Sequence, residues 1–322
     1  MNVLLSSLFH VLIFPGLLFC VVMGVLLSGL DRIWVARMQR RVGPPLLQSW
    51  YDFLKCCGKE TIVPRHAKKA IYFAAPVVGF AALISISLFL PIAGGKPAYS
   101  GTADLVVILY LLTLVSVCMI VGASASGSPF AGVGLSREMV AMISYELPFV
   151  LVILAVSRAI LAPGDSLTNI FSLQAIADYQ AANGPLITRW ALIPAAIAML
   201  FVIPCEVGMH PFDVAEAETE ICEGTLAEYS GPPLAVFRLT HMVKMFIMTA
   251  LFCVLFLGGI TTGIAVVDVV IFVLFCLILT FLTMSLPHGA CARFKVEQVF
   301  KFYWTVVAGL AALSLILVWL GL

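Results

Sequence analysis

Charge is scarce in this chain. Lys, Arg, Asp and Glu together make up 11% of its 322 residues, whereas hydrophobic residues make up 62%. A soluble domain averages about 25% charged and roughly 45–50% apolar residues. The composition therefore excludes an ordinary soluble protein and predicts an integral membrane protein whose first partner is the lipid bilayer. We expect no nucleic-acid partner.

Spaced cysteine motifs are also missing. The nine cysteines form no CxxC pair and no CxxCxxC run, and such spacings are typical of zinc and iron–sulfur sites. A cysteine within an apolar span is an ordinary small hydrophobe. We therefore expect no metal site and no cofactor in this chain.

Long apolar runs are what the chain has in abundance. Eight of them are long enough to cross a bilayer, which takes about 20 helical residues: 8–30, 70–93, 103–123, 136–162, 190–206, 235–259, 263–286 and 300–321. Each must be helical, because the bilayer core offers no water to free backbone groups and the alternation of a barrel strand is absent. The expected fold is all-α, a single polytopic membrane domain over residues 1–322 with about eight transmembrane helices.

Lys and Arg are distributed unevenly between the loops. The amphipathic loop between the first two spans holds nine of the chain's 18. The positive-inside rule then places this loop in the cytoplasm and both termini outside. The loop between the fifth and sixth spans falls on the cytoplasmic side too. We expect a multi-pass protein of the inner (plasma) membrane.

Seven carboxylates are concentrated between residues 206 and 228, with no Lys or Arg among them: Glu206, Asp213, Glu216, Glu218, Glu220, Glu223 and Glu228. Asp213, Glu216, Glu220 and Glu223 recur at spacings of three and four, which would place them on one helical face. One interpretation is a solvated acidic face. The other is a structured excursion, favoured by Gly and Pro at both ends of the stretch and by charges within neighbouring spans.

Charges also lie inside the spans, where they are costly. Glu146 lies about ten residues into the fourth span, and Glu138 about two; a carboxylate near the bilayer centre costs roughly 2.5–3.5 kcal/mol. Pro148 leaves the carbonyl of Ser144 free for water or polar neighbours. Glu146 is either a proton carrier or half of a structural ion pair with a base such as Lys244 or Arg238.

A basic row faces these carboxylates. Arg238, His241 and Lys244 recur every three residues in the sixth span, and this face should point into the bundle because lipid exposure would be costly. Chains of ionisable residues in membranes mark proton or ion routes. The predicted route comprises Glu138, Glu146, Glu206, Asp213, Glu216, Glu218, Glu220, Glu228, His241 and Lys244.

Three ordered motifs resemble one known family. They are RMQRRVGPPLLQSWYDFLKCCGKE at 37–60, SREMVAMISYELP at 136–148 and CEVGMHPFDVAEAETEICEGTLAEYSG at 205–231. All three resemble the largest heel subunit of respiratory complex I, which is subunit 1, or the H subunit, of the respiratory-chain NADH dehydrogenase. The same family supplies the membrane anchor of group 4 membrane-bound nickel–iron hydrogenases, such as formate hydrogenlyase and energy-converting hydrogenase.

The resemblance implies a role in a larger complex. The chain would not be catalytic alone and would have no catalytic residues; it would anchor a soluble electron-transfer arm and couple redox chemistry to proton or sodium movement. The implied partners are hydrogenase-like large and small subunits, which would carry the nickel–iron site and iron–sulfur clusters, and antiporter-like membrane subunits. The implied interface with the arm comprises Arg37, Arg40, Arg41, Gln48, Asp52, Lys55, Lys59, Glu60 and Glu223.

Several departures from complex I favour the hydrogenase branch. Gly43-Pro44-Pro45 stands where complex I usually has Gly-Pro-Asn, and Gly208-Met209-His210 stands where it usually has Asn-Arg-Ala. His241 occupies the place of a usual Glu. The alternatives are a complex I-like dehydrogenase that reduces quinone or methanophenazine, and a stand-alone transporter or structural anchor. A transporter would be expected to show repeated halves and broken helices, which the sequence lacks.

Overall fold

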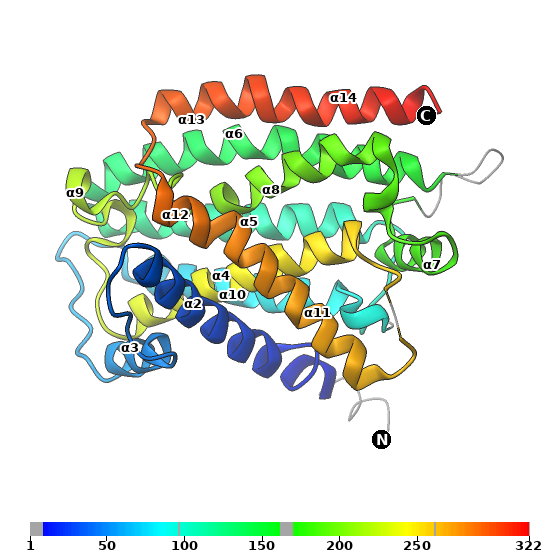
Figure 1. Ribbon diagram of the computed structural model, residues 1–322. Coiled ribbons are helices and arrows are strands. Elements are labelled where there is room, and N and C mark those ends of the chain that lie inside the picture. Colours follow the sequence, from blue (N-terminus) through cyan, green and yellow to red (C-terminus); the bar gives the residue numbers. More distant parts are fainter. Residues whose placement is uncertain (1–8, 96, 162–169, 261, 322) are drawn as a thin grey trace.

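The computed structural model describes residues 9–95, 97–161, 170–260 and 262–321, and over these residues the regular structure is helical, without strands (Figure 1). Eight helical segments are long and apolar enough to cross a membrane: Phe9–Met38, Lys69–Phe89, Asp104–Ser126, Pro129–Ala159, Trp190–Val207, Pro232–Phe256, Ala265–Ala290 and Val296–Trp319. The predicted all-α bundle with eight spans is confirmed.

The spans contain these principal helices: α2 (Leu17–Met38), α4 (Lys69–Phe89), α5 (Asp104–Ser126), α6 (Pro129–Ala159), α8 (Ile193–Val207), α10 (Pro232–Phe256), α11 (Ala265–Thr280), α12 (Leu286–Ala290), α13 (Val296–Phe302) and α14 (Ala308–Trp319). Short helices lie between them: α3 (Gln48–Cys57), α7 (Leu173–Asn183) and α9 (Glu218–Ile221). Single π-helical turns, Phe281–Ser285 and Tyr303–Val307, join α11 to α12 and α13 to α14.

Two span boundaries differ clearly from the prediction. The first span continues to Met38 rather than ending at residue 30, because the charges beyond it find partners: Asp31 accepts a hydrogen bond from Ser285 at 2.7 Å and Arg32 pairs with Asp52 at 2.8 Å. The fourth span begins at Pro129 rather than residue 136. Proline suits the first turn of a helix, where its missing N–H has no partner to lose.

The helix α10 forms the centre of the bundle. Nearly all of its residues are buried, including Lys244, and it packs against α2, α4, α8 and α11. Every residue from 242 to 256 is buried, so an ionised group in that part of the helix, such as Lys244, needs a partner inside the protein.

The polar loops gather at one end of the bundle. Figure 1 shows α3 and α9 together at the left end, whereas α7 and the carboxyl end of α14 lie at the right. The basic first loop and the acidic loop are therefore on the same side, as the alternation of spans requires.

Candidate proton-handling site

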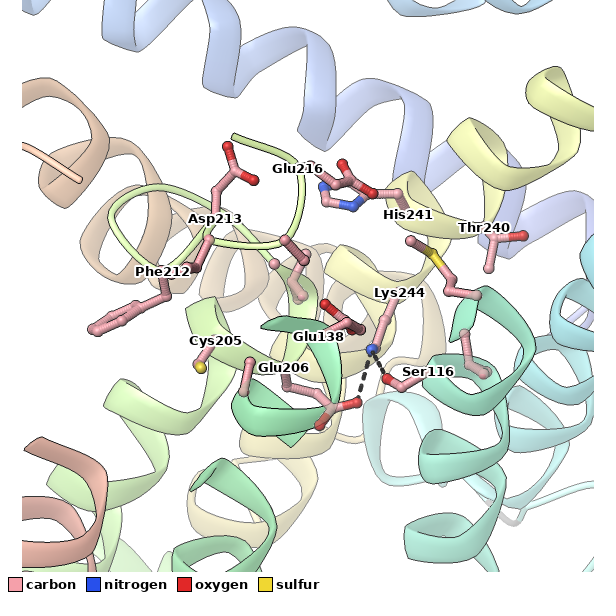
Figure 2. Close-up of a pocket in the computed structure, with 17 residues that line it drawn as sticks. Ser116, Glu138, Cys205, Glu206, Phe212, Asp213, Glu216, Thr240, His241 and Lys244 are labelled. Carbon is pink, nitrogen blue, oxygen red and sulfur yellow. Dashed lines mark hydrogen bonds and ion pairs between the residues drawn. The ribbon is translucent and has the colours of Figure 1, made fainter. Parts of the chain in front are cut away.

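A buried ion pair joins the end of α8 to the middle of α10. The Nζ atom of Lys244 lies 2.8 Å from Oε1 of Glu206, and the two side chains are 7% and 2% exposed. Lys244 also donates a hydrogen bond to Oγ of Ser116 at 3.1 Å (Figure 2). That hydroxyl lies 3.0 Å from the hydroxyl of Tyr145. The network therefore connects α5, α6, α8 and α10.

Local sequence explains where Glu206 stands. The helix α8 ends at Val207 because Gly208 adopts a left-handed conformation with φ of +80°, a common way to terminate a helix. Glu206 consequently lies in the last turn, between the apolar interior and the acidic loop.

A small cavity surrounds the ion pair. Its volume is about 30 Å³, enough for one or two waters. Six predicted route residues line it: Glu138, Glu206, Asp213, Glu216, His241 and Lys244 (Figure 2). The predicted inward orientation of the α10 basic face agrees with this lining.

A larger cavity adjoins the small one. It encloses about 470 Å³, and Asp213, Glu216 and His241 line both cavities. Its walls also include His210, which stacks on His288 with ring centroids 4.9 Å apart. These shared side chains stand where a proton would pass from the larger space to the ion pair.

The acidic loop does not present one helical face, and that expectation was wrong. Between residues 213 and 223 only Glu218–Ile221 is helical, and Cys222 and Glu223 then take left-handed conformations with φ of +50° and +65°. Helical spacing therefore has no meaning across the segment.

Each of three loop carboxylates has its own basic partner. Asp213 pairs with Arg293 at 2.9 Å, Glu223 pairs with Arg238 at 3.6 Å, and Glu220 pairs with Arg137. These bases lie outside the acidic stretch. They fix the loop against α6, α10 and the segment before α13.

Glu216 is the loop carboxylate aimed at the cavities. Burial, followed by the nearby carboxylates of Asp213, Glu138 and Glu223, raises its pKa to about 8, against the opposing effect of Arg238. A group with this pKa exchanges protons near neutral pH.

Two predicted route residues in the loop, Glu228 and Glu220, lie away from the small cavity. Glu228 lines neither cavity, and its backbone carbonyl accepts a hydrogen bond from the Tyr72 hydroxyl at 2.9 Å. Glu220 is an exposed member of its ion pair. Glu218 is the first residue of α9, and its side chain lies outside what the structure describes.

Glu146 lies on the flank of α6 and lines neither cavity. It is half-buried, and Oγ1 of Thr113 lies 3.4 Å from its Oε1. The expected alternative, an ion pair with Lys244 or Arg238, was wrong because those bases pair with Glu206 and Glu223. Glu146 nevertheless follows Tyr145, and Thr113 lies one turn from Ser116, so it adjoins the hydrogen-bonded network.

The predicted arm-facing residues divide into two groups. Those with exposed side chains are Arg37, Arg40, Arg41, Lys55, Lys59 and Glu60. Gln48 and Asp52 on α3 and Glu223 in the acidic loop are half-buried, and Gln48 donates to Asp52 at 2.9 Å. The exposed group forms a surface available to a partner at the loop end of the bundle.

Sequence reasoning missed several polar partners. Asp31 is 3% exposed within α2, and a carboxylate interrupting an apolar run was a signal that could have found it. We assigned no role to Arg137 or Arg293, although both bind loop carboxylates. Nothing in the sequence marked Ser116 as the second partner of Lys244.

Within the described part of the chain, no three His, Cys, Asp or Glu side chains group as metal ligands. The absence of a metal or cofactor from the working protein stays a prediction.

A comparison with known protein families shows which family the chain belongs to. Residues 10–319 match the family model described as NADH dehydrogenase. The chain belongs to the NADH dehydrogenase subunit 1 family. The predicted resemblance is thereby confirmed over nearly the whole chain.

Individual members of this family support the assignment. The H subunit of the NADH-quinone oxidoreductase of Jannaschia sp. (strain CCS1) is 31% identical over 286 residues, covering 85% of this chain and 80% of that protein. Hydrogenase-4 component C of Escherichia coli (strain K12) is 33% identical over 232 residues, covering 72% and 70%.

A solved structure shows the same fold. A chain of the membrane-bound sulfane sulfur reductase, an archaeal respiratory membrane complex, aligns with a TM-score of 0.86 at 26% identity, covering 99% of this chain and 100% of that one. The chain is thus a multi-pass membrane subunit of the kind found in respiratory oxidoreductase complexes.

Proposed function

We propose that this chain couples the redox reaction of a soluble electron-transfer arm to proton movement across the membrane. The observation that carries the proposal is the buried ion pair of Lys244 and Glu206, reached from the acidic loop through two adjoining cavities. A buried pair is sensitive to one added proton, because neutralising Glu206 leaves the Lys244 charge uncompensated.

The acidic loop is the element that the arm would move. Two of its ion pairs, Glu220–Arg137 and Glu223–Arg238, are partly exposed, whereas the Asp213–Arg293 pair is more buried. Exposed pairs contribute about 0–1 kcal/mol each, so a change of charge in a docked arm is enough to rearrange them. Glu216 would then transfer its proton toward Glu206.

The proposed topology follows the distribution of basic residues. The loop before α4 and the acidic loop would face the cytoplasm, and both termini would lie outside the plasma membrane. The exposed residues of the first loop, including Arg40, Arg41 and Lys55, would form the docking surface for the arm.

A nickel–iron hydrogenase is the arm that we favour. The relative named hydrogenase-4 component C supports it, as does the position of His210, which lines the larger cavity where complex I usually has the Ala of Asn-Arg-Ala. In that complex the large and small subunits would hold the nickel–iron site and iron–sulfur clusters. Antiporter-like membrane subunits would complete the ion path.

A quinone-reducing arm is the second candidate. The larger cavity supports it, because Met119, Met242, Met245 and Phe237 give it an apolar wall. The relatives from NADH-quinone oxidoreductases also support a quinone-reducing arm. Such a cavity is within the size range of small-molecule sites, about 300–1,000 Å³.

One purification separates the two candidates. The complete complex, isolated through an affinity tag on this chain, should contain nickel and oxidise or evolve hydrogen if the arm is a hydrogenase. Quinone-dependent turnover without nickel would overturn that choice and establish the second candidate. Loss of proton uptake by vesicles bearing Glu206→Gln, with turnover retained, tests the coupling role in either case.

A further inference from the structure

A second groove lies outside the proton-handling site. It encloses about 650 Å³ between the start of α6, the acidic loop and the start of α13. In Figure 1 these elements meet at the loop end of the bundle. Six charged side chains line it: Arg137, Arg293, Lys295, Lys301, Glu220 and Glu297.

The balance of these charges favours an anion. Four lining groups are cationic and two are carboxylates, and Asp213 beneath the groove offsets one more cation through its contact with Arg293. Lys295 and Lys301 have exposed side chains. Both lysines line the groove, so both can approach one phosphate bound in it.

The remaining wall is apolar and lies at the level of a membrane surface. Val214, Phe294 and Val296 line the groove, and a membrane-spanning segment begins at Val296. Just beyond, Phe300 and Trp304 stack with centroids 5.1 Å apart and are 37% and 45% exposed. Exposed aromatic residues at the start of a span are typical of the headgroup region.

Together these features describe a groove with a surplus of cations, an apolar wall and a position at the start of a membrane-spanning segment. We propose that the groove binds the headgroup of an anionic glycerophospholipid, with its single phosphodiester held by Lys295, Lys301 and Arg137 and its acyl chains lying along Phe300 and Trp304. Basic pockets between membrane helices commonly bind such headgroups.

Occupancy of the groove is linked to the acidic loop. Arg137 is the partner of Glu220 and also donates to the carbonyl of Val214. A phosphate at Arg137 competes with the Glu220 carboxylate for the same guanidinium. Removing the carboxylate should therefore strengthen lipid binding, whereas removing the lysines should weaken it.

The experiment uses the chain in its purified membrane complex, reconstituted in phosphatidylcholine nanodiscs. Spin-labelled phosphatidylglycerol is the probe, and spin-labelled phosphatidylcholine is the reference. The test variants are Lys295→Gln with Lys301→Gln, and Glu220→Gln alone. The matched control is Lys68→Gln with Lys69→Gln, which removes two exposed lysines from another span boundary at the same end.

We expect wild type to retain phosphatidylglycerol in preference to phosphatidylcholine. The preference should fall by about fivefold for each lysine removed from the groove, rise in Glu220→Gln and stay unchanged in the control. Equal retention of the two lipids by wild type, or an unchanged preference in the groove variant, would overturn the proposal. So would displacement of the probe by inorganic phosphate, which indicates a free-phosphate site.

Discussion

Lys244 and Glu206 approach within 2.8 Å in a region where both side chains are almost completely buried, so each charge depends on the other. Removing one partner of a buried pair costs about 3–5 kcal/mol, because an uncompensated charge remains. Lys244→Met should therefore lower the thermal stability of the purified complex markedly, and should also abolish proton uptake by vesicles.

The double variant Lys244→Met with Glu206→Gln separates structure from function. It removes both charges, so most of the lost stability should return, while proton uptake stays absent. Asp178→Asn, an exposed change on α7, serves as the control. Proton uptake at the wild-type level in the double variant would exclude the pair from the route.

Glu146 gives a second prediction, because its carboxylate contacts the hydroxyl of Thr113 rather than a base. If it carries protons, Glu146→Gln should abolish proton uptake more severely than Glu146→Asp, which keeps a titratable carboxyl. Uptake is measured in vesicles and normalised to the amount of complex. Full uptake by the Gln variant would remove Glu146 from the route.

Glu216 should make the acidic loop sensitive to pH. Its pKa is raised on folding from the ordinary value of 4.5 to about 8, so the protonated carboxyl favours the folded loop. This contribution is complete below the unfolded-state value and is lost as the pH rises through about 8. Protection of the amides in residues 208–231 from hydrogen exchange should fall in wild type as the pH rises from about 4.5 to about 8. It should change less in Glu216→Gln. The same pH response in both proteins would contradict the assignment.

The exposed arginines of the first loop should bind the soluble arm. Arg40→Gln with Arg41→Gln should reduce co-purification of the arm subunits severalfold, while the amount of this chain in the membrane stays constant. Lys68→Gln with Lys69→Gln again provides a control of equal charge. Equal recovery of the arm with both double variants would place the interface elsewhere.

Topology can be measured directly. A reporter fused at the C-terminus should read as outside, and one inserted within residues 45–65 should read as cytoplasmic. Reversed signals would invert the proposed direction of proton movement.

The spans were predictable because a bilayer imposes one length and one composition on every helix that crosses it. The inward basic face of α10 was also predictable, because exposing Lys244 to the lipid would be costly. The partners of Lys244 were not predictable. Glu206 and Ser116 reach Lys244 only through the packing of α8 and α5 against α10, and no local pattern encodes that packing.

The predicted helical face of the acidic loop was wrong for a different reason. Spacings of three and four residues imply a shared face only if the backbone is helical throughout. The left-handed conformations of Cys222 and Glu223 break that condition. The bases that organise the loop, Arg137 and Arg293, are far from it in sequence, so the acidic window by itself could not show which bases pair with its carboxylates.

The two π-helical turns affect how relatives of this chain should be aligned. A π turn accommodates one more residue than an α turn, and one residue corresponds to about 100° of rotation. In this chain the extra residues direct Ser285 to Asp31 and the Tyr303 hydroxyl to the carbonyl of Phe201. A relative without either turn should need a one-residue gap in the middle of a membrane helix, where alignments normally forbid gaps. Such gaps would record the gain or loss of these two contacts during divergence.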